Sequence, residues 1–158
     1  MIVKTRKYKL ENGTFIKLAF GNLLKDQWWV FLIYAAICGG YLWIPNMWWI
    51  IGASIALVLY GLFWLIQFAG ISQLEQGKFM FEKLSYEITS QQILIKLNTK
   101  QGMPLKWENI KKAYATKEHF LLVMSKAQMI HLPHRIFNSA NEVKFIETVL
   151  KRKGLIKE

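Results

Sequence analysis

Three histidines are the side chains of this sequence best suited to binding a metal or moving a proton. His131 and His134 lie three residues apart, and His119 is the third. A zinc site needs three or four ligands that converge on one point, whereas the single cysteine, Cys38, lies in a distant apolar run. Alternation along a strand would also turn His131 away from Leu132. We therefore predict no metal site and no cofactor, and interpret the histidines as surface residues at a strand end.

No residue pattern typical of catalysis accompanies them. The sequence contains no recognisable Ser-His-Asp set, Gly-rich phosphate loop or carboxylate pair. Cys38 has the surroundings of a small packing residue inside a helix. We therefore predict no catalytic residues and expect the protein not to be an enzyme.

The elements that would position these residues begin with a long uncharged stretch. Residues 27–74 contain no Lys, Arg, Asp or Glu, and the turn Ile44-Pro45-Asn46 divides them. A membrane-spanning helix needs about 20 apolar residues, and only helices satisfy their own backbone in lipid. Proline disfavours helical geometry at the residue before it. The stretch predicts a transmembrane helical hairpin, with spans at about 27–44 and 47–69 and a turn at 45–46.

Charge and aromatic residues predict how this hairpin is oriented. Residues 1–26 carry six basic and two acidic residues, and residues 75–158 carry fifteen basic and eight acidic ones, so both flanks are basic. Cytoplasmic flanks of membrane spans are enriched in Lys and Arg, and tryptophans gather at the membrane rims. Tryptophans stand near the ends of both predicted spans: Trp28, Trp29, Trp43, Trp48, Trp49 and Trp64. We expect a two-pass protein with both termini in the cytoplasm.

Small residues recur four positions apart within the two spans, a spacing that lets helices approach closely. They are Ala35, Gly39, Gly40, Gly52 and Ala56. Two interpretations stay open. The small faces pack the hairpin against itself, or they form the contact of a homo-oligomer.

The first 26 residues predict a basic arm followed by an amphipathic helix. Residues 2–10 alternate basic and apolar side chains, and Asn12-Gly13-Thr14 offers helix-start chemistry. Apolar residues then recur at helical spacing, with Lys17 and Lys25 on other faces. Such a helix lies in the membrane interface. A basic residue near an anionic leaflet gains about 1 kcal/mol, although these charges also suffice to fix the topology.

Residues 75–158 predict a compact soluble domain. Short alternating segments separated by turns indicate strands at 84–89, 93–97, 103–107, 112–116, 119–124 and 129–132. Ser139-Ala-Asn-Glu142 is a capping box, and a helix with one apolar face follows it. We predict a small α+β domain, a pleckstrin-homology-like (PH-like) β-roll capped by the C-terminal helix.

Three segments of this domain resemble a known family. They are Leu105-Lys-Trp-Glu-Asn-Ile-Lys-Lys112, Thr116-Lys-Glu-His-Phe-Leu-Leu122 and Ile130-His-Leu-Pro-His-Arg-Ile-Phe137. With the order of arm, hairpin and compact domain, the chain resembles the YcxB family of bacterial membrane proteins. His134 stands where a lysine is commoner in that family. The resemblance implies a PH-like domain held at the bacterial cytoplasmic membrane, and it supplies no catalytic residues.

Several side chains of the domain are candidates for binding or for fixing the fold. Trp107 is either a core anchor or the rim of a ligand groove, and Pro133 and Phe137 are expected to fix the turn into the helix. Arg135 has the planar fork that suits a phosphate or carboxylate, although Glu142 is an equally good internal partner. Ten basic residues are candidate contacts for lipid or a partner: Lys4, Arg6, Lys7, Lys17, Lys25, Lys78, Lys83, Lys106, Lys111 and Arg135.

These observations lead to one expected function and two alternatives. We expect a non-enzymatic inner-membrane protein that presents a PH-like binding module to anionic lipid headgroups or to a protein partner. Nucleic acid is not expected as a partner, because the lysines are scattered and no recognition motif accompanies them. One alternative is a bacteriocin immunity or self-protection factor, or a transporter accessory. The other is an oligomeric membrane scaffold built on the small residues.

Overall fold

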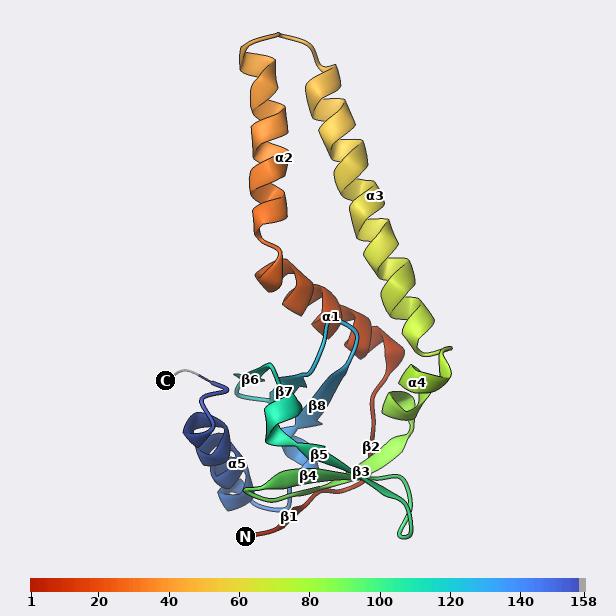
Figure 1. Ribbon diagram of the computed structural model, residues 1–158, viewed down its shortest axis with the longest axis vertical. Helices are drawn as coiled ribbons and strands as arrows, with labels where there is room; N and C mark the ends of the chain where they lie inside the picture. The colour runs from red at the N-terminus through yellow and green to blue at the C-terminus, as the bar shows by residue number, and fades with distance from the viewer. Residues whose placement is uncertain (157–158) are drawn as a thin grey trace. The chain divides into compact units, whose positions relative to one another are not determined.

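The computed structural model describes residues 1–156, and the chain forms two compact units (Figure 1). Residues 1–11 fold together with the chain from residue 74 onward as an α+β unit. Residues 12–73 form a helical unit. From the sequence we grouped the arm with the amphipathic helix as residues 1–26. In the structure the arm belongs to the α+β unit and the helix to the helical unit.

The first sheet of the α+β unit, sheet 1, is antiparallel with the order β1-β3-β4-β5, and β2 also pairs with β3. Its strands are β1 (Val3–Lys4), β2 (Tyr8–Lys9), β3 (Lys83–Ile88), β4 (Gln92–Lys96) and β5 (Gly102–Lys106). Side chains of a strand alternate between its two faces. In β3 the buried residues are Leu84, Tyr86 and Ile88, so sheet 1 has an apolar inner face and a polar outer face.

Sheet 2 is antiparallel with the order β6-β7-β8. Its strands are β6 (Lys112–Ala115), β7 (His119–Val123) and β8 (Met129–Pro133). All five residues of β8 are buried. Each of the six strands predicted from alternation begins and ends within one residue of the expected positions.

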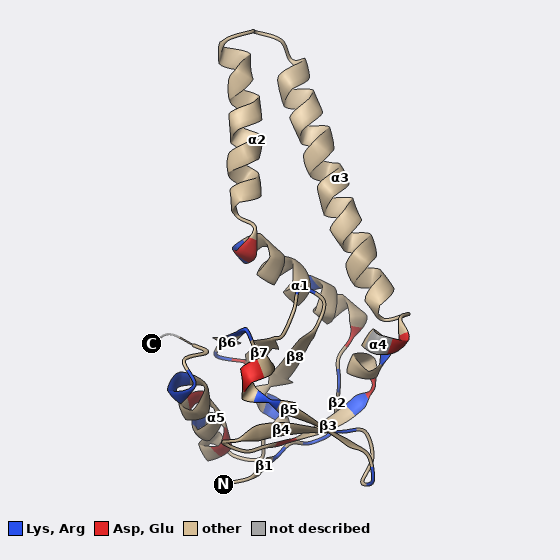
Figure 2. Ribbon diagram, viewed as in Figure 1, with Lys and Arg blue, Asp and Glu red and all other residues tan. Residues whose placement is uncertain are grey.

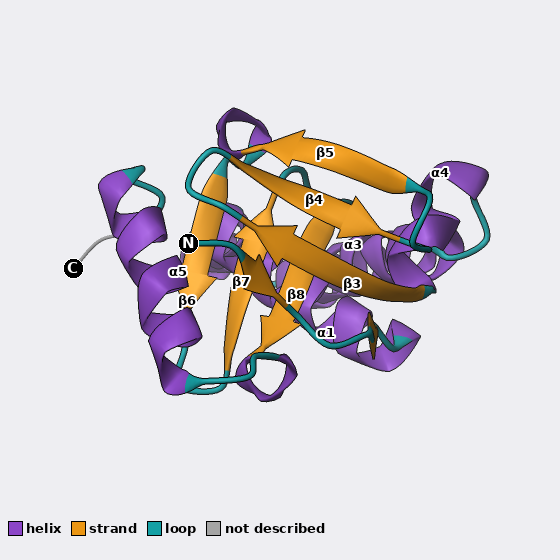
Figure 3. Cartoon of the chain, turned by 90° about the horizontal axis from the view of Figure 1, so that it is seen from below, coloured by secondary structure: helices purple, strands orange, loops and turns teal. Residues whose placement is uncertain are grey.

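A C-terminal helix, α5 (Ala140–Arg152), packs against the core of the two sheets (Figure 3). The N-cap half of its predicted capping box is confirmed: the Ser139 hydroxyl accepts a hydrogen bond from the Glu142 amide at 3.3 Å. The Glu142 carboxylate accepts from the Asn138 amide at 2.7 Å, one residue before the expected Ser139 amide. Ile146, Val149 and Leu150 lie in the core. Gly154 follows the helix with φ of 69°, a conformation that costs glycine little. The predicted α+β class, with two antiparallel sheets, is therefore confirmed.

Short helical turns connect these elements. They are α4 (Glu75–Lys78) and the 3₁₀ turns η2 (Phe79–Phe81), η3 (Trp107–Asn109) and η4 (His134–Ile136). The turn η2 brings buried Met80 and Phe81 into the α+β unit directly after the helical unit ends.

The helical unit contains α1 (Asn12–Asp26), α2 (Trp29–Gly39), the 3₁₀ turn η1 (Gly40–Leu42) and α3 (Trp48–Ile71). Helices α2 and α3 run side by side and form a helical hairpin (Figure 1). The Tyr34 and Ser54 hydroxyls, 3.1 Å apart, link them. At the tip, the Asn46 side chain accepts a hydrogen bond from the Trp48 amide at 3.0 Å, which closes the turn.

One helix among the described residues is long and apolar enough to cross a membrane. It is α3, with 24 residues and a mean hydropathy of 2.2. The first predicted span, 27–44, is helical over a shorter length: α2 and η1 together rise only about 22 Å, against a hydrocarbon core of about 30 Å. Length and composition therefore support a membrane location through α3, whereas the two-span hairpin is not confirmed.

The packing of α5 leads to a prediction about stability. Ile146 is fully buried, so Ile146→Ala should lower the free energy of opening of the α+β unit by about 2–5 kcal/mol, through lost burial and the cavity left behind. Amide hydrogen exchange of β7 and β8 in the detergent-solubilised chain measures this opening. The exposed Lys144→Ala, in the same helix, is the control and should leave the exchange rates almost unchanged. Equal exchange in both variants would contradict this packing.

Candidate functional site

The outer face of sheet 1 carries all the lysines of its strands. In the strand register five lysines share this face with one acidic residue, Glu87; we call the five the lysine face: Lys4, Lys9, Lys83, Lys96 and Lys106. By contrast, α2 and α3 carry no charged residue (Figure 2). The lysine face therefore concentrates positive charge on one side of the α+β unit.

Two lysines of this face oppose each other directly. Lys9 and Lys83 are cross-strand partners, and both are exposed. Like charges in this arrangement are destabilising. Elsewhere on the face Glu87 accepts a hydrogen bond from Lys96 at 2.7 Å and lies 3.6 Å from Lys4, and the Lys96 bond lowers the pKa of Glu87. An anion bound near Lys9 and Lys83 would relieve their repulsion.

The structure gathers only some of the predicted contact residues on this face. Lys4, Lys83 and Lys106 lie on it, together with Lys9 and Lys96, which we had not singled out. The others are elsewhere: Arg6 and Lys7 between β1 and β2, Lys78 in α4, Lys111 before β6, Arg135 in η4, and Lys17 and Lys25 in α1. Lys96 shares this face because the β3–β4 register pairs it with Ser85, and alternation within a single strand does not give that register.

A tyrosine and two histidines meet where the N-terminal arm passes β8. The Tyr8 hydroxyl lies 2.9 Å from Nδ1 of His131, and the His119 ring centroid lies 4.7 Å from that of His131. The Arg135 guanidinium lies 5.7 Å from the centre of the Tyr8 ring. His131 is only 9% exposed, so our interpretation of it as a surface residue is wrong. All five residues of β8 are buried, so both faces of this strand lie inside the unit, and His131 with them.

Burial sets the protonation of this cluster. It lowers the pKa of His131 to about 4, and the nearby His119 and Arg135 charges act in the same direction. Burial likewise lowers the pKa of His119 and raises that of Tyr8. At neutral pH both side chains are therefore uncharged, and the Tyr8 hydroxyl shares one hydrogen bond with Nδ1 of His131, whose direction depends on the His131 tautomer. Within residues 1–156 no group of three or more His, Cys, Asp or Glu side chains is placed to hold a metal ion.

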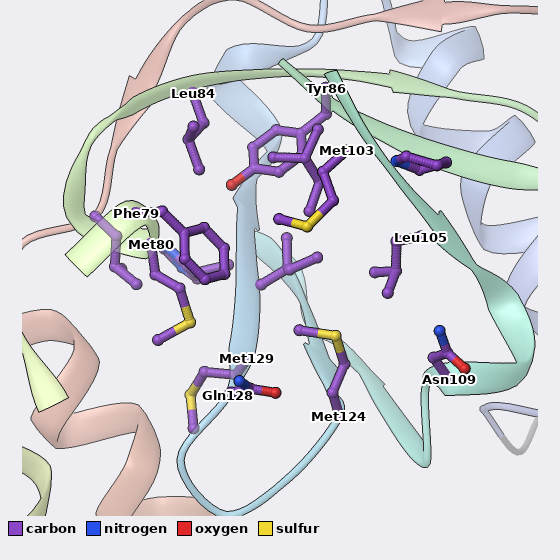
Figure 4. A pocket seen from close by; sticks show the side chains of 15 residues that line it. Phe79, Met80, Leu84, Tyr86, Met103, Leu105, Asn109, Met124, Gln128 and Met129 are labelled. Atoms are coloured by element: carbon purple, nitrogen blue, oxygen red, sulfur yellow. The ribbon is translucent and has the colours of Figure 1, made fainter. Parts of the chain in front are cut away.

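A cavity of about 300 Å³ lies inside the α+β unit (Figure 4). Its walls come from the N-terminal arm, η2, sheet 1, η3 and the β7–β8 hairpin. The lining residues are Leu10, Phe79, Met80, Leu84, Tyr86, Ile95, Met103, Pro104, Leu105, Asn109, Met124, Gln128, Met129, Ile130 and His131. Sequence reasoning missed this cavity, because its walls are contributed by segments far apart in the chain.

The three predicted groove or anchor residues lie in the body of the domain. Trp107 is 3% exposed, and its indole N–H donates to the Thr89 carbonyl at 3.0 Å. Pro133 ends β8, and the Phe137 ring packs edge-on against Phe120 at 6.3 Å. None of the three lines the cavity.

The small residues of the hairpin have different surroundings. A Cβ added to Gly40 would lie 3.0 Å from the Trp49 ring, so glycine allows this close approach of η1 to α3. A Cβ added to Gly39 or Gly52 would meet nothing within 4 Å. Ala35 and Ala56 are exposed in the single chain.

Comparison with known proteins agrees with the motifs in the sequence. The fold defines a small α+β domain of two antiparallel sheets and a C-terminal helix, joined to an apolar helical unit. The sequence model of the YcxB-like protein family matches residues 88–150, from the end of β3 into α5. The YcxB-like resemblance is therefore confirmed over this segment. No curated protein and no solved structure matches the chain.

The histidine cluster predicts how stability depends on pH. A histidine in the unfolded chain has a pKa near 6.5, whereas His131 in the folded chain has a pKa of about 4. Between these values only the unfolded state binds the proton, so stability should fall as pH decreases from about 6.5 towards 4. Amide exchange of β8, measured across this range, should show the loss.

The variant His131→Gln removes the titrating group and should make this loss shallower. His134→Gln is the matched control, because it removes a nearby histidine and leaves the Tyr8 hydrogen bond intact. If His131→Gln shows the same pH dependence as the wild type, the buried neutral histidine is not the cause.

Proposed function

We propose that this protein is a non-enzymatic binding module at the cytoplasmic side of a bacterial membrane, anchored by a two-span helical hairpin. The observation that carries the proposal is that the two ends of the chain fold together. Residues on both sides of the apolar helical unit belong to the same α+β unit.

Backbone hydrogen bonds hold the N-terminal arm to the rest of the α+β unit. Val3 pairs with Ile88, the Thr5 amide donates to the Tyr86 carbonyl, and the Arg6 amide donates to the Ile136 carbonyl, each bond being 2.9 Å long. A chain that leaves this unit at residue 12 to enter a membrane must return to the same side by residue 74. This requirement favours an even number of crossings, and α3 is long enough for one of them.

The second crossing is supplied by α2, with help from its neighbours. Hydrogen bonds from the Gln27 amide to the Leu23 carbonyl, at 2.8 Å, and from the Val30 amide to the Gln27 carbonyl, at 3.1 Å, nearly join α1 to α2. The end of α1 can therefore add length to this span. Large apolar side chains cover the hairpin, among them Leu32 at 56% and Ile66 at 70% exposure. A surface of this kind is stable in lipid and aggregates in water.

The architecture of the α+β unit supports a PH-like module. Two antiparallel sheets pack against each other, and α5 contributes to the core between them. The sequence match to YcxB-like proteins covers most of this roll. No constellation of acid, base and nucleophile among the described residues suggests a reaction, and binding is the function that such a roll supports best.

The charge of the lysine face indicates what kind of partner it binds. Five lysines and one glutamate form a surface that attracts anions, and each lysine near an anionic leaflet contributes about 1 kcal/mol. A domain tethered to the membrane meets acidic headgroups at high local concentration. We therefore assign the lysine face to anionic lipid headgroups, and an acidic protein surface is the competing partner.

Lysine footprinting tests the assignment on the full chain in lipid nanodiscs. Acylation of Lys9 and Lys83 should be slower in nanodiscs containing phosphatidylglycerol than in phosphatidylcholine alone, and added salt should restore the rate. Lys117, exposed outside the face, is the internal control. The double variant Lys9→Gln/Lys83→Gln should also weaken the protection of Lys106, whereas Lys117→Gln should not. Equal acylation in both lipids would leave the acidic protein as the partner.

The topology has its own test. In a Cys38→Ser background, Met47→Cys lies at the tip of the hairpin and Lys117→Cys lies in the α+β unit. A membrane-impermeant maleimide added to intact bacterial cells should label the first and spare the second until the cells are lysed. Labelling of Lys117→Cys in intact cells, or of Met47→Cys only after lysis, is the result that contradicts a two-span hairpin with cytoplasmic termini.

A further inference from the structure

We propose that the cavity of the α+β unit binds a single unbranched hydrocarbon chain from a membrane amphiphile. This site is separate from the lysine face, which lies on the opposite side of sheet 1. The inference rests on the proposed function only in that a membrane supplies the ligand.

The lining is apolar and adaptable. Four of the six methionines of the chain line the cavity, and each comes from a different segment: Met80 from η2, Met103 from β5, Met124 from the β7–β8 turn and Met129 from β8. Figure 4 shows Met103 and Met124 pointing into the same space from opposite walls. Methionine side chains are flexible and polarizable, so they adapt to a mobile ligand. A flexible alkyl chain fits such a lining better than a rigid ring system.

The lining also excludes a charged group from the interior. None of its fifteen residues is Lys, Arg, Asp or Glu. Moving an unpaired charge into such a place is strongly unfavourable. The polar members are Asn109, Gln128, Tyr86 and His131, and His131 is neutral at pH 7. Asn109 and Gln128 are exposed, so their amides mark the mouth, where the polar end of an amphiphile would lie.

The volume fits one chain. At about 300 Å³ the cavity lies at the lower limit of small-molecule sites, which span roughly 300–1,000 Å³. A lipid headgroup with two acyl chains exceeds this space. Apolar cavities in proteins stay dry and take up apolar molecules.

Short stretches of chain connect two walls of the cavity to the helical unit. Leu10 lies two residues before α1, and Phe79 lies eight residues after the end of α3. An extended chain of eight residues spans under about 30 Å. These links tether the α+β unit to the membrane that α3 would enter, and tethering raises the local concentration of alkyl chains. The tether favours an alkyl chain from the bilayer over an apolar side chain of a soluble partner.

Photolabelling of the full chain tests the site. The protein is reconstituted in phosphatidylcholine–phosphatidylglycerol vesicles that contain one of two probes. The first is a fatty acid with a diazirine near its methyl end, and the second is phosphatidylglycerol with the same diazirine on one acyl chain. After irradiation, mass spectrometry should find label on peptides that contain Met80, Met103 or Met129. Label from the first probe alone identifies a single-chain amphiphile, and label from the second identifies a phospholipid chain.

The apolar helices provide the internal reference. Label on α2 and α3 without label on the cavity peptides overturns the inference and leaves the membrane anchor standing. Absence of label on both overturns the inference and the anchor together. The first of these results would point to an apolar side chain of a partner as the occupant.

A cavity-filling variant distinguishes a chain bound inside the cavity from a chain bound at the surface. Met103→Trp places a large ring at the rim of the cavity, where Met103 is 49% exposed, and should abolish the cavity label. Gln92→Trp is the matched control, because Gln92 is an exposed, uncharged strand residue outside the lining. Both should keep wild-type amide exchange in β7. Cavity label that persists equally in both variants shows that the chain binds elsewhere and overturns the inference.

Discussion

The antiparallel pairing of the N-terminal arm with β3 is the interaction on which the other features depend. Thr5 and Tyr86, which exchange hydrogen bonds, are 81 residues apart. Closing so long a loop costs conformational entropy, but that cost grows only slowly with length, and fully buried Val3 helps to offset it. The pairing makes the helical unit an insertion within the α+β unit. It also opposes Lys9 to Lys83 and brings Tyr8 to His131.

Strand alternation then gives sheet 1 two chemically different faces. The outward residues of β3 begin with Lys83, whereas the inward ones begin with Leu84. Because neighbouring strands keep the same alternation in register, lysines collect on one side and apolar side chains on the other. The lysine face and the cavity are thus two consequences of one periodicity, and we propose separate ligands for them: anionic headgroups for the face and a single hydrocarbon chain for the cavity.

The interior between the sheets is filled unevenly. Ile146, Val149 and Leu150 of α5 complete the core, and none of them lines the cavity. Where α5 does not reach, flexible methionines and the neutral His131 form the walls. The same burial that creates an apolar interior lowers the pKa of His131. The predicted loss of stability at acidic pH and the uncharged cavity therefore have a common cause, the low polarity of this part of the core.

The sequence by itself determined the features that depend on near neighbours. The alternating strands, the capping box at Ser139 and the uncharged helices follow from local periodicity and composition, so they were predictable. Tertiary structure alone decided which residues meet across the chain. It turned His131 inward beside Tyr8, 123 residues away, added Lys9 and Lys96 to one face, and built a cavity from separate segments. Such contacts depend on strand register and long-range pairing, which no local pattern encodes.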